Sequence, residues 1–144
     1  MGIFKNILLA VDLRVKHDAS TISRAVALSK KLKATLHIIH VMEPIYGYGA
    51  VEGQILIEME KNILDDIRKT FHDLASGYAI SSDKLIIEIG SPKHIIVEQA
   101  KKLKVDLIIV GAHSKHGLNT VLGSTANAVI NQAHCDVLTI RTLE

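Results

Sequence analysis

The sequence lacks the features of several common protein classes. Its single cysteine, Cys135, cannot form an internal disulfide, which is typical of a reducing compartment. No uninterrupted apolar run approaches the length of about 18 residues that a membrane-spanning helix requires. The short apolar run near the N-terminus begins after Lys5, ends at Asp12 and has no small-residue cleavage site, so we interpret it as a strand and not as a signal peptide. We therefore expect a cytoplasmic protein with no membrane partner.

The sequence also has little excess charge. Its 17 lysines and arginines and 15 acidic residues leave a formal net charge of +2. A protein that binds nucleic acid needs a clustered basic surface, whereas these basic residues are spread along the chain. The content of 48% hydrophobic and 22% charged residues lies in the globular range, and 144 residues suit one core. We expect a single domain over residues 1–144 and no nucleic-acid partner.

Five short runs rich in isoleucine, leucine and valine predict buried strands. Their apolar residues follow one another without strict alternation, which is typical of parallel strands covered on both faces. The runs are residues 6–11, 35–41, 84–89, 106–110 and 136–140.

Helical patterns separate these runs. Apolar residues recur every three or four positions over residues 22–32 and 54–75. A third helix is predicted after Ser91, with Pro92 at its first position, and a fourth opens at the sequence GSTANAVI. This alternation predicts an α/β fold, namely a doubly wound five-stranded parallel sheet with helices on both faces.

The carboxyl ends of the first and fourth predicted strands form the candidate binding site. Doubly wound sheets bind ligands outside these ends, where the winding direction reverses. The first strand ends with Ala10 and Val11, and the carboxylate of Asp12 can then accept hydrogen bonds from a ribose hydroxyl or an adenine amine. The fourth strand ends with Val110, and Gly111 follows it.

The segment after Val110 is longer and richer in glycine than a turn requires. It reads GAHSKHGLNTVLGST and contains three glycines, which allow the backbone to approach phosphate oxygens closely. Ser124 and Thr125 lie at the predicted start of the fourth helix, where free amides and the helix dipole favour an anion. His113 is a candidate polar contact to phosphate or sugar. Together these features predict a nucleotide site.

Purely structural roles would explain some of the same residues. Gly111 could be the tight exit of a strand, Gly123 the boundary of a helix and Ser124 its cap. Two common nucleotide motifs are absent, GxxxxGK[ST] and a GxGxxG after the first strand, so we expect neither a P-loop NTPase nor a dinucleotide-binding Rossmann domain. A receiver domain needs an aspartate at the end of the third strand, where this chain has Ile89 and Gly90.

Other reactive side chains favour structural interpretations. His37 and His40 lie three positions apart on a predicted strand and so point to opposite faces. His113 and His116 have no carboxylate or thiolate at ligand spacing, so we predict no metal site. We interpret Cys135 as a buried, unreactive thiol.

One long loop is predicted over residues 42–53. It carries Tyr46 and Tyr48. These rings could cover a bound adenine as a lid, or they could pack partly on a surface loop without contact to a ligand.

Four separated segments, in the same order along the chain, resemble a known family. They read NILLAVDL, LHIIHVMEP, GSPKHIIVEQAKKLKVDLIIVGAHSKHGL and LGSTANAVINQAHCDVLTIR. Over essentially the whole chain they resemble the universal stress protein family, in particular its A-type branch. The resemblance implies an adenine nucleotide alpha hydrolase-like fold with sheet order 3-2-1-4-5, a cytoplasmic homodimer, and a role under stress without an established reaction.

The resemblance also implies roles for individual residues. Family members that hold ATP carry an aspartate at the end of the first strand and a spaced glycine motif after the fourth. Asp12 matches the aspartate, Gly111 the first glycine, and Gly123 with Ser124 the last pair. Val41 matches the position whose backbone contacts adenine.

Two positions depart from the pattern of ATP-binding members. Ser114 replaces the second glycine, and eight residues, 115–122, separate it from Gly123. Its Cβ and hydroxyl would lie near the phosphates, where they either obstruct them or donate a hydrogen bond. Leu13 follows Asp12 where many binders have glycine or serine, although this residue is common in the A-type branch.

We therefore predict a stress-response regulator that binds ATP or ADP, with or without Mg²⁺. The alternative is a nucleotide-free homodimeric protein-interaction module that acts in the stress response. Both interpretations expect unidentified protein partners and a homodimer through the last strand, because an apolar sheet edge requires a partner. We predict no catalytic residues, since ATP hydrolysis needs a placed metal and a group that orients water, and leave weak ATPase activity as an alternative.

The predicted contact residues are Ala10, Val11, Asp12, Val41, Val110, Gly111, His113, Ser114, Gly123, Ser124 and Thr125.

Overall fold

Strands and helices alternate along the chain in the computed structural model, which describes residues 3–13, 18–44, 53–115, 119–121 and 123–143. The elements are β1 (Asn6–Ala10), α1 (Asp18–Leu32), β2 (Thr35–Met42), α2 (Gly53–Gly77), the 3-10 helix η1 (Ser82–Lys84), β3 (Leu85–Ile89), α3 (Pro92–Lys102), β4 (Leu107–Lys115), β5 (Asn119–Val121), α4 (Ser124–Gln132) and β6 (Asp136–Leu143). Every predicted strand and helix is present, and β5 is an addition.

Five parallel strands form the body of the sheet in the order β3-β2-β1-β4-β6. Numbered along the chain as parallel strands, this is the predicted order 3-2-1-4-5, so the fold class is confirmed. The winding direction reverses between β1 and β4, which are neighbours although almost a hundred residues separate them. The switch point of the sheet therefore lies at the carboxyl ends of these two strands.

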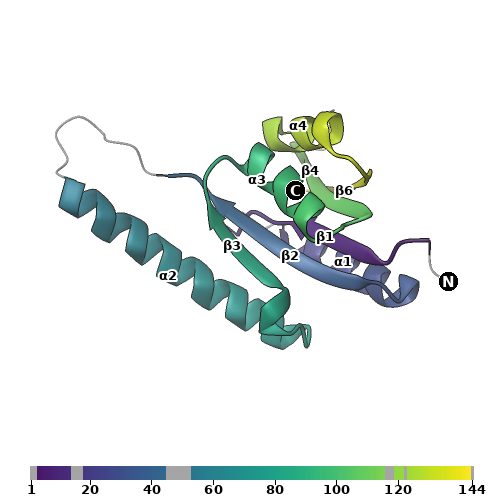
Figure 1. Ribbon diagram of the computed structural model, residues 1–144, viewed down its shortest axis with the longest axis horizontal. Coiled ribbons are helices and arrows are strands. Elements are labelled where there is room, and N and C mark those ends of the chain that lie inside the picture. Colours follow the sequence, from purple (N-terminus) through teal and green to yellow (C-terminus); the bar gives the residue numbers. More distant parts are fainter. Residues whose placement is uncertain (1–2, 14–17, 45–52, 116–118, 122, 144) are drawn as a thin grey trace.

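Two hydrophobic cores lie on the two faces of the sheet (Figure 1). Ile7 and Leu9 of β1 point into the core under α1 and α2, and Leu8 points into the core under α3 and α4; none of the three is exposed. Each such side chain contributes about 1.5–3 kcal/mol by leaving water. Burial on both faces explains why the strands are apolar at successive positions.

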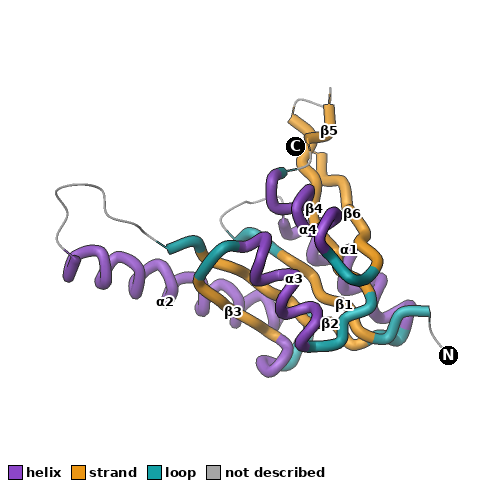
Figure 2. Tube along the Cα trace, turned by 45° about the horizontal axis from the view of Figure 1, so that its top comes forward, coloured by secondary structure: helices purple, strands orange, loops and turns teal. Residues whose placement is uncertain are grey.

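β4 extends beyond its predicted end. β6 accompanies it from the pair Leu107 and Asp136 to the pair Ser114 and Leu143. Residues 113–115 also pair with the antiparallel strand β5, which projects past the other strands (Figure 2). The expectation of an irregular loop directly after Val110 is therefore wrong, because β6 supplies a distant pairing partner that keeps the segment extended.

The long helix α2 is buried over only part of its length. Ile67, Phe71 and Ala75 in its second half point into the core. Its first half leads away from the sheet (Figure 1) and exposes four large apolar side chains, those of Ile55, Ile57, Met59 and Ile63. No helix in the described part of the chain is long and apolar enough to cross a membrane.

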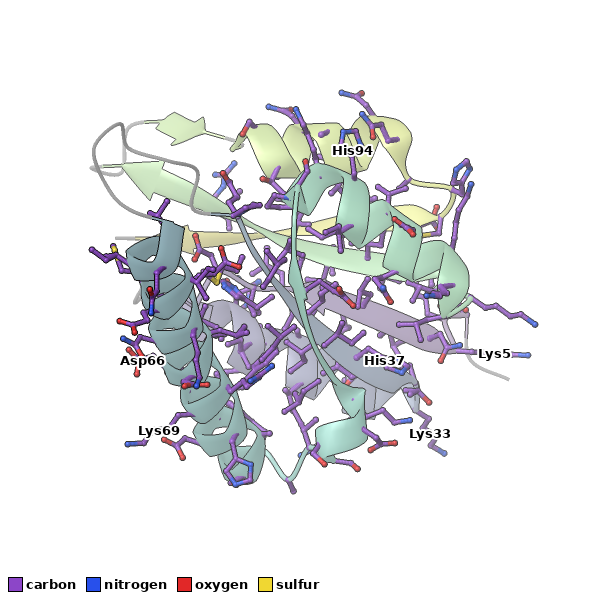
Figure 3. The ribbon with its side chains drawn as sticks, turned by 60° about the vertical axis from the view of Figure 1, so that its left-hand side comes forward. Lys5, Lys33, His37, Asp66, Lys69 and His94 are labelled. Atoms are coloured by element: carbon purple, nitrogen blue, oxygen red, sulfur yellow. The ribbon has the colours of Figure 1, made fainter. Side chains whose placement is uncertain are left out.

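His37 on β2 makes the stability of the fold depend on pH. Burial lowers the pKa of its ring, and the positive charge of Lys84 lowers it further, while Asp83 partly opposes the shift. Its Nδ1 atom is buried without a hydrogen-bond partner (Figure 3 labels the residue). A histidine with a depressed pKa adds stability above its unfolded pKa near 6.5, and this stability is lost as the pH falls through the folded pKa.

We expect His37→Gln to flatten the loss of unfolding free energy between pH 7 and pH 5. Glutamine has no charge to acquire in this environment, so the linkage to this position disappears. Urea unfolding at several pH values measures the slope, with His72→Gln on the exposed surface of α2 as the control. Equal slopes in the wild-type protein and His37→Gln would contradict the assignment.

Candidate functional site

A pocket of about 260 Å³ lies at the carboxyl ends of β1, β2 and β4, next to the start of α4. It occupies the switch point of the sheet, where the strand pattern placed the candidate site. Nine of the predicted contact residues line it, namely Ala10, Val11, Asp12, Val41, Val110, Gly111, Gly123, Ser124 and Thr125. The fold therefore brings together residues from four separate segments of the chain.

The end of β1 positions Asp12 at the pocket wall. The amide of Val11 still donates to the carbonyl of Ile39 at 2.9 Å, as the last contact of the β1–β2 ladder. The chain then leaves the sheet, and Asp12 follows half-buried. A carboxylate at this point can accept hydrogen bonds from the hydroxyls of a sugar or from an exocyclic amine.

His40 is a pocket residue that the sequence analysis missed. It is 3% exposed, and its Nδ1 lies 3.1 Å from the carbonyl oxygen of Val11 and 3.4 Å from the amide nitrogen of Leu13. With a proton, Nδ1 donates to the Val11 carbonyl; without one, it accepts from the Leu13 amide. Either bond holds the chain on one side of Asp12, so His40 is a positioning residue for this carboxylate.

The first turn of α4 forms the opposite wall. Gly123 is its N-cap with φ of −63°, and the helix begins with Ser124 and Thr125. Amides in the first turn of a helix lack intrahelical partners and can bind an anion. A Cβ built on Gly123 meets no atom within 4 Å, so neither backbone conformation nor packing requires glycine here. The open space beside Gly123 is what a ligand at this wall would need.

For two predicted contact residues, His113 and Ser114, the structure describes the backbone and not the side chain. His113 and Ser114 belong to the extended part of β4, and their backbones pair with β5 and β6. His116, Tyr46 and Tyr48 lie outside the described residues. The structure adds six lining residues that were not predicted as contacts: Ile39, His40, Glu43, Pro92, Ile96 and Ala126.

The side-chain charges of the pocket are acidic. Asp12 and Glu43 contribute carboxylates, and none of the described lining residues is a lysine or an arginine. Mg²⁺ commonly binds proteins through one or two carboxylates together with phosphate oxygens of a nucleotide, so these two residues would suit an ion that arrives with its ligand. The described residues contain no group of three or more His, Cys, Asp or Glu side chains that could hold a metal.

Cys135 lies before β6 and does not line this pocket. Burial raises the pKa of its thiol, and the negative charges of Asp136 and Asp106 raise it further. The side chain is only partly buried, so the expectation of a buried thiol is wrong. Thiolate is the reactive form of cysteine, and the raised pKa favours the unreactive thiol.

Comparison with known proteins identifies the family. The model of the universal stress protein family matches residues 3–141. The chain belongs to the universal stress protein family. Universal stress protein A homolog 2 of Coxiella burnetii is 42% identical over 142 residues, which are 98% of this chain and 97% of that protein.

Solved structures of the family share the fold. Universal stress protein UspA from Lactobacillus plantarum is 27% identical, with a TM-score of 0.79 over 95% of this chain and 97% of that one. A universal stress protein solved in complex with cAMP is 22% identical, with a TM-score of 0.65 over 96% of this chain and 97% of that one. The second comparison supports the fold alone.

Proposed function

We propose that the protein is a cytoplasmic stress-response regulator that binds ATP or ADP in the pocket between Asp12 and the start of α4. Asp12 binds the ribose or the base, the backbone of Val41 contacts adenine, and Gly123, Ser124 and Thr125 bind the first phosphate. Binding of the nucleotide changes the conformation of the β4–β5 extension, and with it a surface to which a protein partner binds. Mg²⁺ accompanies the phosphates where Asp12 and Glu43 can reach it.

One observation carries this proposal. The pocket at the switch point unites the carboxylate of Asp12, the end of β2 at Val41 and the free first turn of α4 around about 260 Å³. Sheets of this type bind ligands at this point. One universal stress protein has been solved in complex with cAMP, an adenine nucleotide, and we extend this class of ligand to the present chain as part of the proposal.

The proposal is for a binding protein and not for an enzyme. Hydrolysis of ATP needs a placed metal and a group that orients water. The described pocket offers Asp12 and Glu43 for a metal but no arginine or lysine to stabilise the charge that develops on a transferred phosphoryl group.

We also propose that the protein is a homodimer through β6. Among the described strands, β6 pairs only with β4, so its other edge is open, and Leu138 on it is 37% exposed. An open apolar edge is a template for pairing with a second strand. Sedimentation equilibrium at micromolar protein concentration tests this, and a monomer would contradict it.

A second candidate function is a nucleotide-free interaction module. The exposed apolar side chains in the first half of α2 favour it, because a cluster of such side chains on one helix is typical of a protein-binding surface. This function requires that the pocket stay empty at cellular nucleotide concentrations, which distinguishes it from the first.

Titration calorimetry with ATP, with and without Mg²⁺, tests the choice after mass spectrometry has shown whether nucleotide co-purifies. We expect micromolar affinity, and we expect Asp12→Ala to weaken it at least tenfold, since hydrogen bonds to a charged group contribute about 1.5–3 kcal/mol. Asp73→Ala on the exposed surface of α2 is the control. No binding and no co-purified nucleotide would favour the interaction module.

A further inference from the structure

A second cavity of about 360 Å³ adjoins the candidate nucleotide pocket. The two share the wall formed by Glu43, Pro92, Ser124 and Thr125 and are therefore direct neighbours. The second cavity lies between the starts of α3 and α4, which are in contact; His94 marks the first turn of α3 in Figure 3. Its remaining lining residues are Pro44, Gly90, Ser91 and Lys93.

The first pocket suits a nucleoside better than a polyphosphate. Its volume is slightly below the range of about 300–1,000 Å³ that is usual for ligand sites. Its ionisable lining residues are Asp12, Glu43 and His40, so a chain of phosphates confined to it would face two carboxylates without a lysine or arginine on the described wall. The terminal phosphates of a nucleotide would therefore gain from additional space and from a positive charge beside the described wall.

The second cavity offers both. Lys93 brings an ammonium group that can turn toward the cavity because its side chain is exposed, and Glu43 is the acidic residue on the shared wall. Ser91 is the N-cap of α3, yet its hydroxyl makes no capping hydrogen bond. Ser91 and Ser124 add hydroxyl groups that can donate to phosphate oxygens.

The backbone around the second cavity is held in place from both sides. The amide of Gly90 donates to the carbonyl of Met42 at 2.9 Å, which ties the exit of β3 to the end of β2. The carbonyl of Ser91 accepts from the amides of His94 and Ile95 at 3.1 and 3.0 Å. These hydrogen bonds hold the backbone of Gly90 and Ser91 in place at the wall of the cavity.

We propose that the second cavity receives the terminal phosphates of the nucleotide, with Lys93 as their counter-charge. The inference rests on the proposed function, because the nucleoside must first occupy the pocket at Asp12. The first phosphate lies at Ser124 and Thr125 on the shared wall, and the following phosphates run toward Lys93.

Calorimetry with adenosine, ADP and ATP at low ionic strength and without Mg²⁺ tests this placement. Lys93→Gln should lower the affinity for ADP and ATP by roughly three- to tenfold and leave the affinity for adenosine unchanged, since only the phosphates interact with the ammonium group. Lys101→Gln in the last turn of α3 removes the same charge from the same helix, away from both cavities, and should change none of the three affinities.

The outcomes separate this inference from the proposed function. If ATP binds the wild-type protein and Lys93→Gln with equal affinity, the terminal phosphates lie elsewhere, although the nucleotide site stands. If Lys93→Gln lowers the affinities for adenosine and ATP equally, the lysine supports the structure and does not bind phosphate. If none of the three ligands binds the wild-type protein, the proposed function fails and this inference fails with it.

Discussion

Replacing Gly123 by valine is expected to abolish ATP binding at micromolar concentrations while the protein stays folded. Gly123 has φ of −63° and ψ of 163°, which any residue can adopt, and an added Cβ meets open space. That open space belongs to the pocket of about 260 Å³, where the two methyl groups of valine would occupy the position of the ligand beside the first turn of α4. Placing excess groups in a closely fitted site costs about 1–3 kcal/mol or more.

The control for this substitution is Gly53→Val. Gly53 also begins a helix, and its added Cβ also meets no atom within 4 Å, but it does not line the pocket. Both variants should lose at most about 1 kcal/mol of stability, as expected for an unfavourable residue near a helix N-terminus. Calorimetry with ATP and thermal unfolding measure the two quantities. Unchanged affinity in Gly123→Val would place the phosphates away from this wall.

The positions of the site residues on strand ends could be predicted because they depend on local patterns. Asp12 and Gly111 each follow an apolar run, and the carboxyl ends of parallel strands meet at one edge of a sheet. Ser124 and Thr125 could be placed because a glycine and two small polar residues precede a helical repeat. These signals lie within a few residues of the positions that they describe.

His40 and the β4–β5 extension could not be predicted in this way. The role of His40 depends on the register that places it beside the Val11 carbonyl on another strand, and nothing near it in the sequence reports that register. The segment after Val110 has the composition of a loop, yet β6 pairs with it up to Ser114. Sheet propensity depends on such partners more than on the residues themselves.

Gly90, by contrast, is a glycine that the fold does require, and Gly90→Ala should destabilise the protein by roughly 1–3 kcal/mol. Its φ is +153°, a conformation that residues with a side chain rarely adopt, and an added Cβ would lie 2.4 Å from Cδ1 of Ile95. The hydrogen bond from its amide to the carbonyl of Met42 opposes a change in φ. In a domain of this size the melting temperature should fall by about 2–4 °C for each kcal/mol.

Gly77→Ala is the matched control. Gly77 lies at the end of α2, and a Cβ there meets no atom within 4 Å. Gly77 does not have a positive φ, so alanine can adopt its conformation. Alanine should leave the stability unchanged or raise it by about 0.4–1 kcal/mol, because it lowers the conformational entropy of the unfolded chain. A loss at position 77 equal to that at position 90 would show that both result from removal of glycine as such.

A double variant separates the two causes of the loss at Gly90. Cδ1 is the far end of a flexible side chain, so Ile95 can move aside at a smaller cost than the backbone, and we expect the strained φ to dominate. In Gly90→Ala with Ile95→Ala, the contact is absent but the backbone strain stays. The effect of Gly90→Ala should therefore be almost the same in the wild-type and Ile95→Ala backgrounds. Its disappearance in the Ile95→Ala background would show that the steric contact, and not the backbone, makes glycine necessary at the edge of the second cavity.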